Sequence, residues 1–219
     1  MRFHLSTQPL SILALALATV TAAARPVNAA LIDFEPIPSL TLVRDQFLSL
    51  GLRVTGAGPL SGLVFSEGMF GVGNYGNSPT QVMHIGERGE PTTLYFVSPV
   101  DPDTVVGAMS FSLLMGDGHP DSETFPVTYF DVSGGILQGP TQFTTVENGL
   151  RLTATSLTLG GLIGSVELRL LPASASGVSS DDLEFTAVPE PSMLPILVLS
   201  GALFFFLWRR RGARPEQLR

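Results

Sequence analysis

The residues that could carry catalytic chemistry in this chain are few. Between residues 30 and 187 the histidines are His84 and His119, and neither an H-E-x-x-H nor a G-x-S-x-G sequence is present. The zinc-hydrolase and α/β-hydrolase arrangements therefore lack essential parts. Cysteine and lysine are absent from the whole chain, which excludes thiol chemistry, a Schiff base and a P-loop lysine. A carboxylate pair for glycoside hydrolysis stays open, because two acids can converge from any loops. We expect a protein that is not an enzyme.

One acidic stretch partly matches a calcium-binding loop. Asp117, Asp121 and Glu123 have the alternating spacing of such a loop. However, Ser122 and Thr128 stand where the loop requires glycine and glutamate. The pattern therefore favours an acidic surface turn.

The stretch GVGNYG at residues 71–76 matches G-x-G-x-x-G. The Asn-Ser-Pro that follows cannot open a long helix, so the stretch is interpreted as a flexible loop and not as a dinucleotide site. Tyr75 in this loop is the candidate glycan contact, because an exposed aromatic face can stack on a sugar ring. Tyr95 and Tyr129 lie in strand-like stretches and are candidates for the core. The only tryptophan, Trp208, belongs to the hydrophobic C-terminal segment.

Hydrophobic residues in the region 30–187 alternate with a period of two, which predicts strands. Gly, Pro, Asn, Asp or Ser clusters separate the strand-like stretches, and no convincing amphipathic helix occurs between the termini. We predict an all-β domain, an antiparallel β-sandwich of jelly-roll type, with an immunoglobulin-like sandwich as the alternative. In LIDFE, Ile32 and Phe34 should face one way and Asp33 and Glu35 the other. In DDLEF, Leu183 and Phe185 should likewise face away from Asp182 and Glu184. PASASGVSS, residues 172–180, is interpreted as a turn before the last strand.

The charge of this region narrows the range of partners. Residues 30–187 contain 17 acidic residues and five arginines, a net charge of −12. Such a surface repels phosphate backbones, which argues against nucleic-acid binding and favours cations. The length suits a single domain with a sizeable core.

The N-terminus has the three-part layout of a secretory signal peptide. Arg2 lies in a short polar start, an apolar run covers residues 10–20, and small residues follow. We predict a signal peptide at residues 1–29, cleaved after Ala29, with cleavage after Ala24 and an uncleaved anchor as alternatives.

The C-terminus combines an uncharged segment with a basic cluster. Residues 193–208 carry no charge, and as a helix they would span about 24 Å, slightly less than a hydrocarbon core of about 30 Å. Arg209, Arg210 and Arg211 resist burial and should remain cytoplasmic, in a basic tail at 209–219. We predict a transmembrane helix with the domain on the opposite side. A buried helix or an aggregation-prone strand is the alternative.

Pro189, Glu190 and Pro191, followed by the hydrophobic segment and the three arginines, resemble the tail of PEP-CTERM proteins of exopolysaccharide-producing Gram-negative bacteria. The resemblance implies that residues 188–192 are a linker read by exosortase, a membrane-embedded processing enzyme. The alternative is a proline-rich spacer beside the membrane. LIDFE, RDQFLSLGLRV, FDVSGGIL and SSDDLEF resemble the jelly-roll domains of these proteins, which are similar to carbohydrate-binding modules.

The resemblance also implies a structural calcium ion between the first and last strands. Glu35 and Asp182, with Asp33 or Asp181 nearby, could supply carboxylate oxygens if those strands pair. The alternative is solvated acids at strand edges that discourage aggregation.

The expected function follows from these features together. We expect an exported, exosortase-processed protein that is transiently anchored in the inner membrane, with its domain in the periplasm. It would end at the cell surface or in the extracellular matrix, with a structural or adhesive role linked to exopolysaccharide. A carbohydrate-binding module of weak affinity is the alternative, and a glycan-active enzyme is the third hypothesis.

Overall fold

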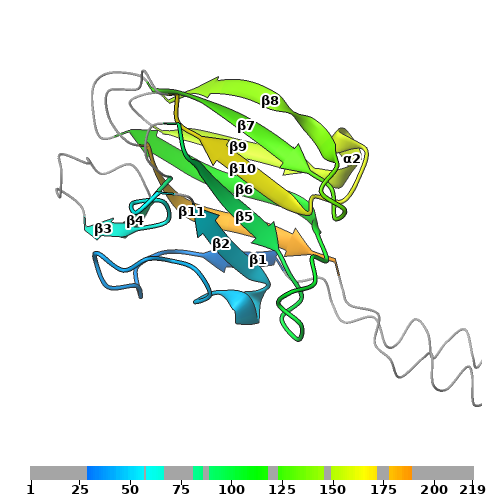
Figure 1. The fold of residues 1–219 in the computed structure, drawn as a ribbon, viewed down its shortest axis with the longest axis horizontal. Helices are drawn as coiled ribbons and strands as arrows, with labels where there is room; N and C mark the ends of the chain where they lie inside the picture. The colour runs from blue at the N-terminus through cyan, green and yellow to red at the C-terminus, as the bar shows by residue number, and fades with distance from the viewer. Residues whose placement is uncertain are drawn as a thin grey trace, which may run out of the picture. The chain divides into compact units, whose positions relative to one another are not determined.

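The computed structural model describes residues 29–56, 58–66, 81–85, 89–117, 123–145, 149–171 and 178–188 (Figure 1). All of them belong to one compact unit, Val27–Val188. The predicted signal peptide before Ala29, the Tyr75 loop, the Pro-Glu-Pro motif, the hydrophobic segment and the basic tail lie outside the described residues. Within the described part of the chain, no helix is long and apolar enough to cross a membrane.

Six of the described strands form one sheet. Its path is β3-β4-β11-β6-β9, and β1 also pairs with β11. The bounds of its strands are β1 (Ala29–Ile32), β3 (Val64–Ser66), β4 (Gln81–His84), β6 (Ala108–Asp117), β9 (Leu150–Thr155) and β11 (Val178–Ala187).

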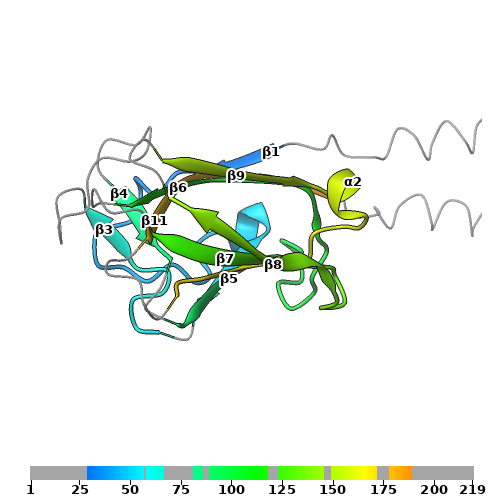
Figure 2. The same ribbon diagram turned by 90° about the horizontal axis from the view of Figure 1, so that it is seen from above.

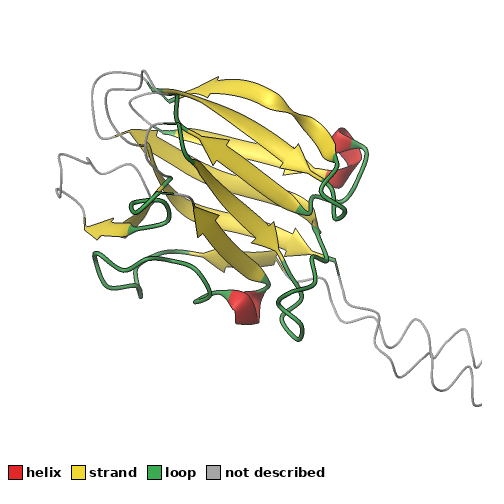
Figure 3. Ribbon diagram, in the orientation of Figure 1, coloured by secondary structure: helices red, strands yellow, loops and turns green. Residues whose placement is uncertain are grey.

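Five further strands form a second sheet in the order β2-β5-β10-β7-β8. They are β2 (Leu52–Gly56), β5 (Pro91–Phe96), β7 (Thr124–Phe130), β8 (Ile136–Thr144) and β10 (Ser165–Arg169). The only other regular elements in the described residues are single turns, η1 (Leu48–Leu50) and α2 (Ser156–Leu159), as Figure 3 shows. Pairing is antiparallel in both sheets.

The two sheets lie face to face as two layers, and the chain passes repeatedly from one to the other (Figure 2). The predicted antiparallel β-sandwich is therefore confirmed. Alternation along the strands explains the arrangement, because successive side chains point to opposite faces of a sheet. In β5, Thr92, Leu94 and Phe96 are buried and the residues between them are half-buried.

Aromatic rings from both sheets meet in the core. Phe96 of β5 contacts Phe111 of β6 and Phe185 of β11, with ring centroids 6.1 and 5.0 Å apart. All three side chains are at most 2% exposed. The chain has no cysteine to form a disulfide, and this packing stabilises the sandwich because each buried aromatic side chain removes a large apolar area from water.

The first and last strands behave as their alternation predicts. Ile32 and Phe34 are buried, as are Leu183 and Phe185, whereas the acids between them are not. β1 and β11 pair directly, with Ile32 opposite Leu183.

The start of the last strand differs from the prediction. Residues 178–180 belong to β11, whereas the small residues of PASASGVSS predict a turn there. Ser179 and Ser180 are buried, and their hydroxyls donate to the backbone carbonyls of Gly116 and Met83, each at 3.2 Å. Serine is tolerated in this buried strand because neighbouring strands accept its hydrogen bonds.

Candidate functional site

The face of the five-stranded sheet that points away from the core presents polar and aromatic side chains in rows. In the first row, Tyr95 of β5 and Phe130 of β7 lie opposite each other across Ser165 of β10. Tyr95 and Phe130 are half-buried, and Ser165 between them is only 7% exposed. Strands about 4.8 Å apart place the backbones of the two aromatic residues about 10 Å apart. This row therefore places two aromatic side chains on one face of the sheet.

A second row lies two residues further along each strand, where Thr93 of β5 and Thr128 of β7 flank Glu167 of β10. A groove of about 410 Å³ opens beside it, lined by Pro126, Thr128, Pro140, Gln142, Glu167, Arg169 and Leu171. Its wall therefore combines apolar surface from two prolines and a leucine with hydroxyl, amide and charged groups.

The edge strand β8 bends beside this groove because of a glycine. The β7–β8 register shifts between the pairs Val127–Thr141 and Tyr129–Gln138, so that two residues of β8, Gly139 and Pro140, lie opposite Thr128. Gly139 has a φ of +129°, and a Cβ there would lie 2.8 Å from both the Thr128 Cα and the Val127 carbonyl oxygen. Only glycine fits this close approach. The irregularity occurs next to Pro140, which lines the groove.

The charged groups of the groove are paired with each other. Arg169 Nη2 donates to Glu167 Oε1 at 3.0 Å. Both residues lie on β10 two positions apart, so their side chains leave the same face of the sheet.

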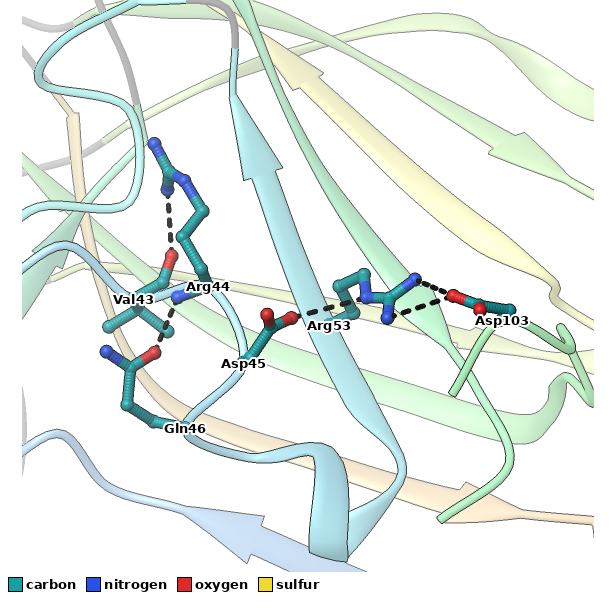
Figure 4. Close-up of polar contacts among 6 residues, drawn as sticks. All are labelled: Val43, Arg44, Asp45, Gln46, Arg53 and Asp103. Atoms are coloured by element: carbon teal, nitrogen blue, oxygen red, sulfur yellow. Dashed lines mark hydrogen bonds and ion pairs between the residues drawn. The ribbon is translucent and has the colours of Figure 1, made fainter. Parts of the chain in front are cut away.

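Arg53 of β2 is the third charged residue on the strands of this sheet, and it is also paired with carboxylates. Its Nε donates to Asp45 Oδ1 at 3.3 Å, and its two terminal nitrogens reach Asp103 Oδ1 at 3.3 and 3.4 Å (Figure 4). The neighbouring Arg44 instead donates to the carbonyls of Val43 and Ser61, at 2.8 and 2.7 Å.

The predicted glycan contact, Tyr75, lies outside the described residues. Of the two tyrosines considered for the core, Tyr129 is there, 2% exposed, and burial raises its pKa to about 12. Tyr95 points instead to the outer face, between the buried Leu94 and Phe96. Alternation in PTTLYF could have revealed this, because Tyr95 falls in phase with Thr93 and not with the leucine and phenylalanine.

The predicted calcium ligands lie where the first and last strands meet. Glu35 Oε1 accepts a hydrogen bond from the backbone nitrogen of Gln81 at 2.9 Å, and the side-chain oxygen of Gln81 is buried without a hydrogen-bond partner. Asp182 Oδ2 lies 3.6 Å from Arg151 Nη2. Carboxylate and amide oxygens fit Ca²⁺, although no group of three His, Cys, Asp or Glu side chains suited to a metal occurs among the described residues. The calcium site stays a prediction.

Two other titratable groups have shifted pKa values. Burial lowers the pKa of His84 to about 4, and its ring packs edge-on against Phe65 with centroids 5.5 Å apart. The pKa of Asp131 is lowered chiefly by the Ser133 hydroxyl and also by backbone N–H donors of the β7–β8 turn. Neither lines the groove.

No protein-family model and no curated protein matches the chain. Solved structures to which it is similar include the K2 cleaved adhesin domain of Lys-gingipain, at 15% identity and a TM-score of 0.42, covering 73% of this chain and 99% of that one. The CBM22-1 xylan-binding domain from Paenibacillus barcinonensis Xyn10C has 13% identity and a TM-score of 0.40, covering 77% and 99%. CsCBM6-3 from Clostridium stercorarium, solved in complex with cellobiose, has 16% identity and a TM-score of 0.35, covering 72% and 92%. At these values the likeness assigns no ligand to this chain.

Proposed function

We propose that this protein is an exported β-sandwich that binds extracellular polysaccharide through the outer face of its five-stranded sheet, in a structural or adhesive role. The observation that carries the proposal is the groove of about 410 Å³ on the face that also bears Tyr95, Ser165 and Phe130. Exopolysaccharide is the expected ligand, because the tail resembles that of proteins from bacteria that produce it.

The chemistry of this face suits a sugar polymer. A sugar ring has an apolar C–H face and a rim of hydroxyls, so it needs flat apolar surface beside hydrogen-bonding groups. The flat apolar surface comes from Tyr95, Phe130 and the groove prolines. The hydrogen-bonding groups are those of Thr128 and Gln142.

Binding is favoured over catalysis by the carboxylates of this face. Glycoside hydrolysis generally requires two carboxyl groups on either side of the scissile bond. Glu167 is the only acid on the five strands, and it is bonded to Arg169. The role is therefore proposed to be non-catalytic.

Export follows the route that the two ends of the chain predict. The signal peptide at 1–29 directs secretion, residues 193–208 anchor the chain transiently in the inner membrane, and Arg209 to Arg211 stay in the cytoplasm. Exosortase then processes the chain at Pro189–Glu190–Pro191 and sends the domain to the cell surface or the matrix.

Isothermal titration of the unit Val27–Val188 against the producing strain's exopolysaccharide tests the binding. We expect saturable binding that Tyr95→Ala and Phe130→Ala each weaken about fivefold, from the loss of roughly 1 kcal/mol of aromatic contact. Leu157→Ala, at a side chain 91% exposed outside the five-stranded sheet, should change nothing. A signal that depends on Tyr75 alone would place the contact in its loop, and absence of binding would refute the proposal.

A reporter fused upstream of Pro189 and the mass of the secreted protein test the route. A reporter that is active only in the cytosol would contradict export. The mature mass identifies both cut sites. Turnover of the polymer that a single carboxylate change abolishes would make the protein a glycan-active enzyme instead.

A further inference from the structure

The outer face of the five-stranded sheet is almost free of charge. Its five strands contain three charged residues, Arg53, Glu167 and Arg169. The remaining polar groups on them are the neutral hydroxyls and amides of Thr, Ser, Tyr and Gln. Since residues 30–187 carry a net charge of −12, the near-neutrality of this face distinguishes it from the chain as a whole.

Both arginines on these strands already face carboxylates. Arg169 donates to Glu167 at 3.0 Å within the groove, and Arg53 lies between Asp45 and Asp103 (Figure 4). Side-chain exposures of 47% for Arg169 and 25% for Glu167 keep the groove pair within reach of a ligand. On the described strands of this sheet, no arginine is left without an acidic partner.

This arrangement disfavours an acidic ligand. A uronate, sulfate or phosphate group on a sugar binds best to an unpaired guanidinium, which it contacts through two parallel hydrogen bonds. Arg169 Nη2 is already bonded to Glu167 Oε1, so an acidic group that reached Arg169 would lie beside that carboxylate as a like charge. A sugar hydroxyl meets no such penalty, because it can donate to Glu167 and accept from Arg169 while the pair stays intact.

We infer that the groove selects neutral polysaccharide chains over acidic ones, and that Glu167 sets this selectivity by neutralising Arg169. This inference rests on the proposed function and specifies its ligand class. Glu167 is then a specificity residue, and its replacement by glutamine should release Arg169 for an acidic sugar while keeping the size and shape of the side chain.

The test compares the unit Val27–Val188 with two variants on matched polymers at low salt. The neutral probes are dextran, galactomannan and a mixed-linkage glucan, and the acidic probes are alginate and polygalacturonate. Glu167→Gln is the test variant. Glu184→Gln is the control, because it removes the same charge from an exposed position on β11 of the other sheet. Thermal unfolding confirms that both variants are folded.

We expect the wild type to bind at least one neutral polymer tenfold more tightly than either acidic polymer. Glu167→Gln should narrow this ratio at least tenfold by gaining affinity for the acidic polymers, and Glu184→Gln should leave it within twofold of the wild type. Equal or tighter binding of acidic polymers by the wild type overturns the inference and leaves the proposed function intact, as does an equal effect of the two variants. If the wild type binds none of these polymers and does not bind the strain's own exopolysaccharide, both the inference and the proposed function are overturned.

Discussion

The half-buried histidine of β4, His84, makes the stability of the domain depend on pH. His84 packs edge-on against Phe65, and burial lowers its pKa from 6.5 to about 4. In the folded state the imidazole is therefore neutral down to about pH 4, whereas in the unfolded chain it takes up a proton below about pH 6.5.

Proton linkage determines whether acid raises or lowers the free energy of unfolding. Between pH 6.5 and 4 the unfolded chain binds more protons at His84 than the folded chain does, so the free energy of unfolding falls as the pH is lowered through this window. The stability that the neutral His84 contributes is therefore fully present above pH 6.5. A shift from 6.5 to about 4 corresponds to at most about 3.5 kcal/mol, at about 1.4 kcal/mol per pH unit. For a domain of this size, that equals a fall in Tm of roughly 7 to 14 °C.

Urea unfolding of the unit Val27–Val188 at intervals from pH 7.5 to pH 4 measures the effect. Carboxylates also titrate at the acidic end, so the quantity to follow is the difference between the wild type and His84→Gln, which keeps a polar but non-titrating side chain. This difference should decrease by about 2 to 3 kcal/mol on acidification. In Phe65→Ala, which removes the covering ring, the NMR-titrated pKa of His84 should move back toward 6.5. A difference that is independent of pH would refute the reasoning.

Three further predictions concern packing and metal binding. Gly164→Ala should destabilise the domain by about 2 kcal/mol or more, because its Cβ would lie 2.3 Å from the Asp131 carbonyl oxygen. Gly134→Ala has only its φ of +84° against it and should cost about 1 kcal/mol, so equal losses in urea unfolding would contradict the steric account. Phe96→Ala should cost about 3 to 5 kcal/mol, and a loss below 1 kcal/mol would show that the aromatic core is not as packed as the ring contacts indicate. Calcium should raise the Tm of the wild type but not of the double variant Glu35→Gln/Asp182→Asn, and an unchanged Tm with chelator would remove the metal hypothesis.

Much of the fold could be predicted from local alternation. The stretch LRLTAT coincides with β9, and Asp33 and Glu184 are exposed while the hydrophobic residues on either side of each are buried, as expected. These assignments succeed because the two-residue period of a strand is a local property of the sequence. Local alternation did not predict the strand at residues 178–180. Serines favour a turn unless neighbouring strands accept their hydrogen bonds, and those strands are not evident from the local sequence.

The candidate site shows where local reasoning ends. The amino-acid sequence was enough to predict the β-sandwich class, the absence of thiol and lysine chemistry, and the inward-facing side chains of Ile32, Phe34, Leu183 and Phe185. It left open that Tyr95 and Phe130, 35 positions apart in the chain, lie on either side of Ser165. It also left open that a groove forms beside Glu167, where the pairing of β8 with β7 is irregular. Only the tertiary structure decided these points, because the pairing of distant strands depends on the packing of the whole core and not on any short stretch of residues.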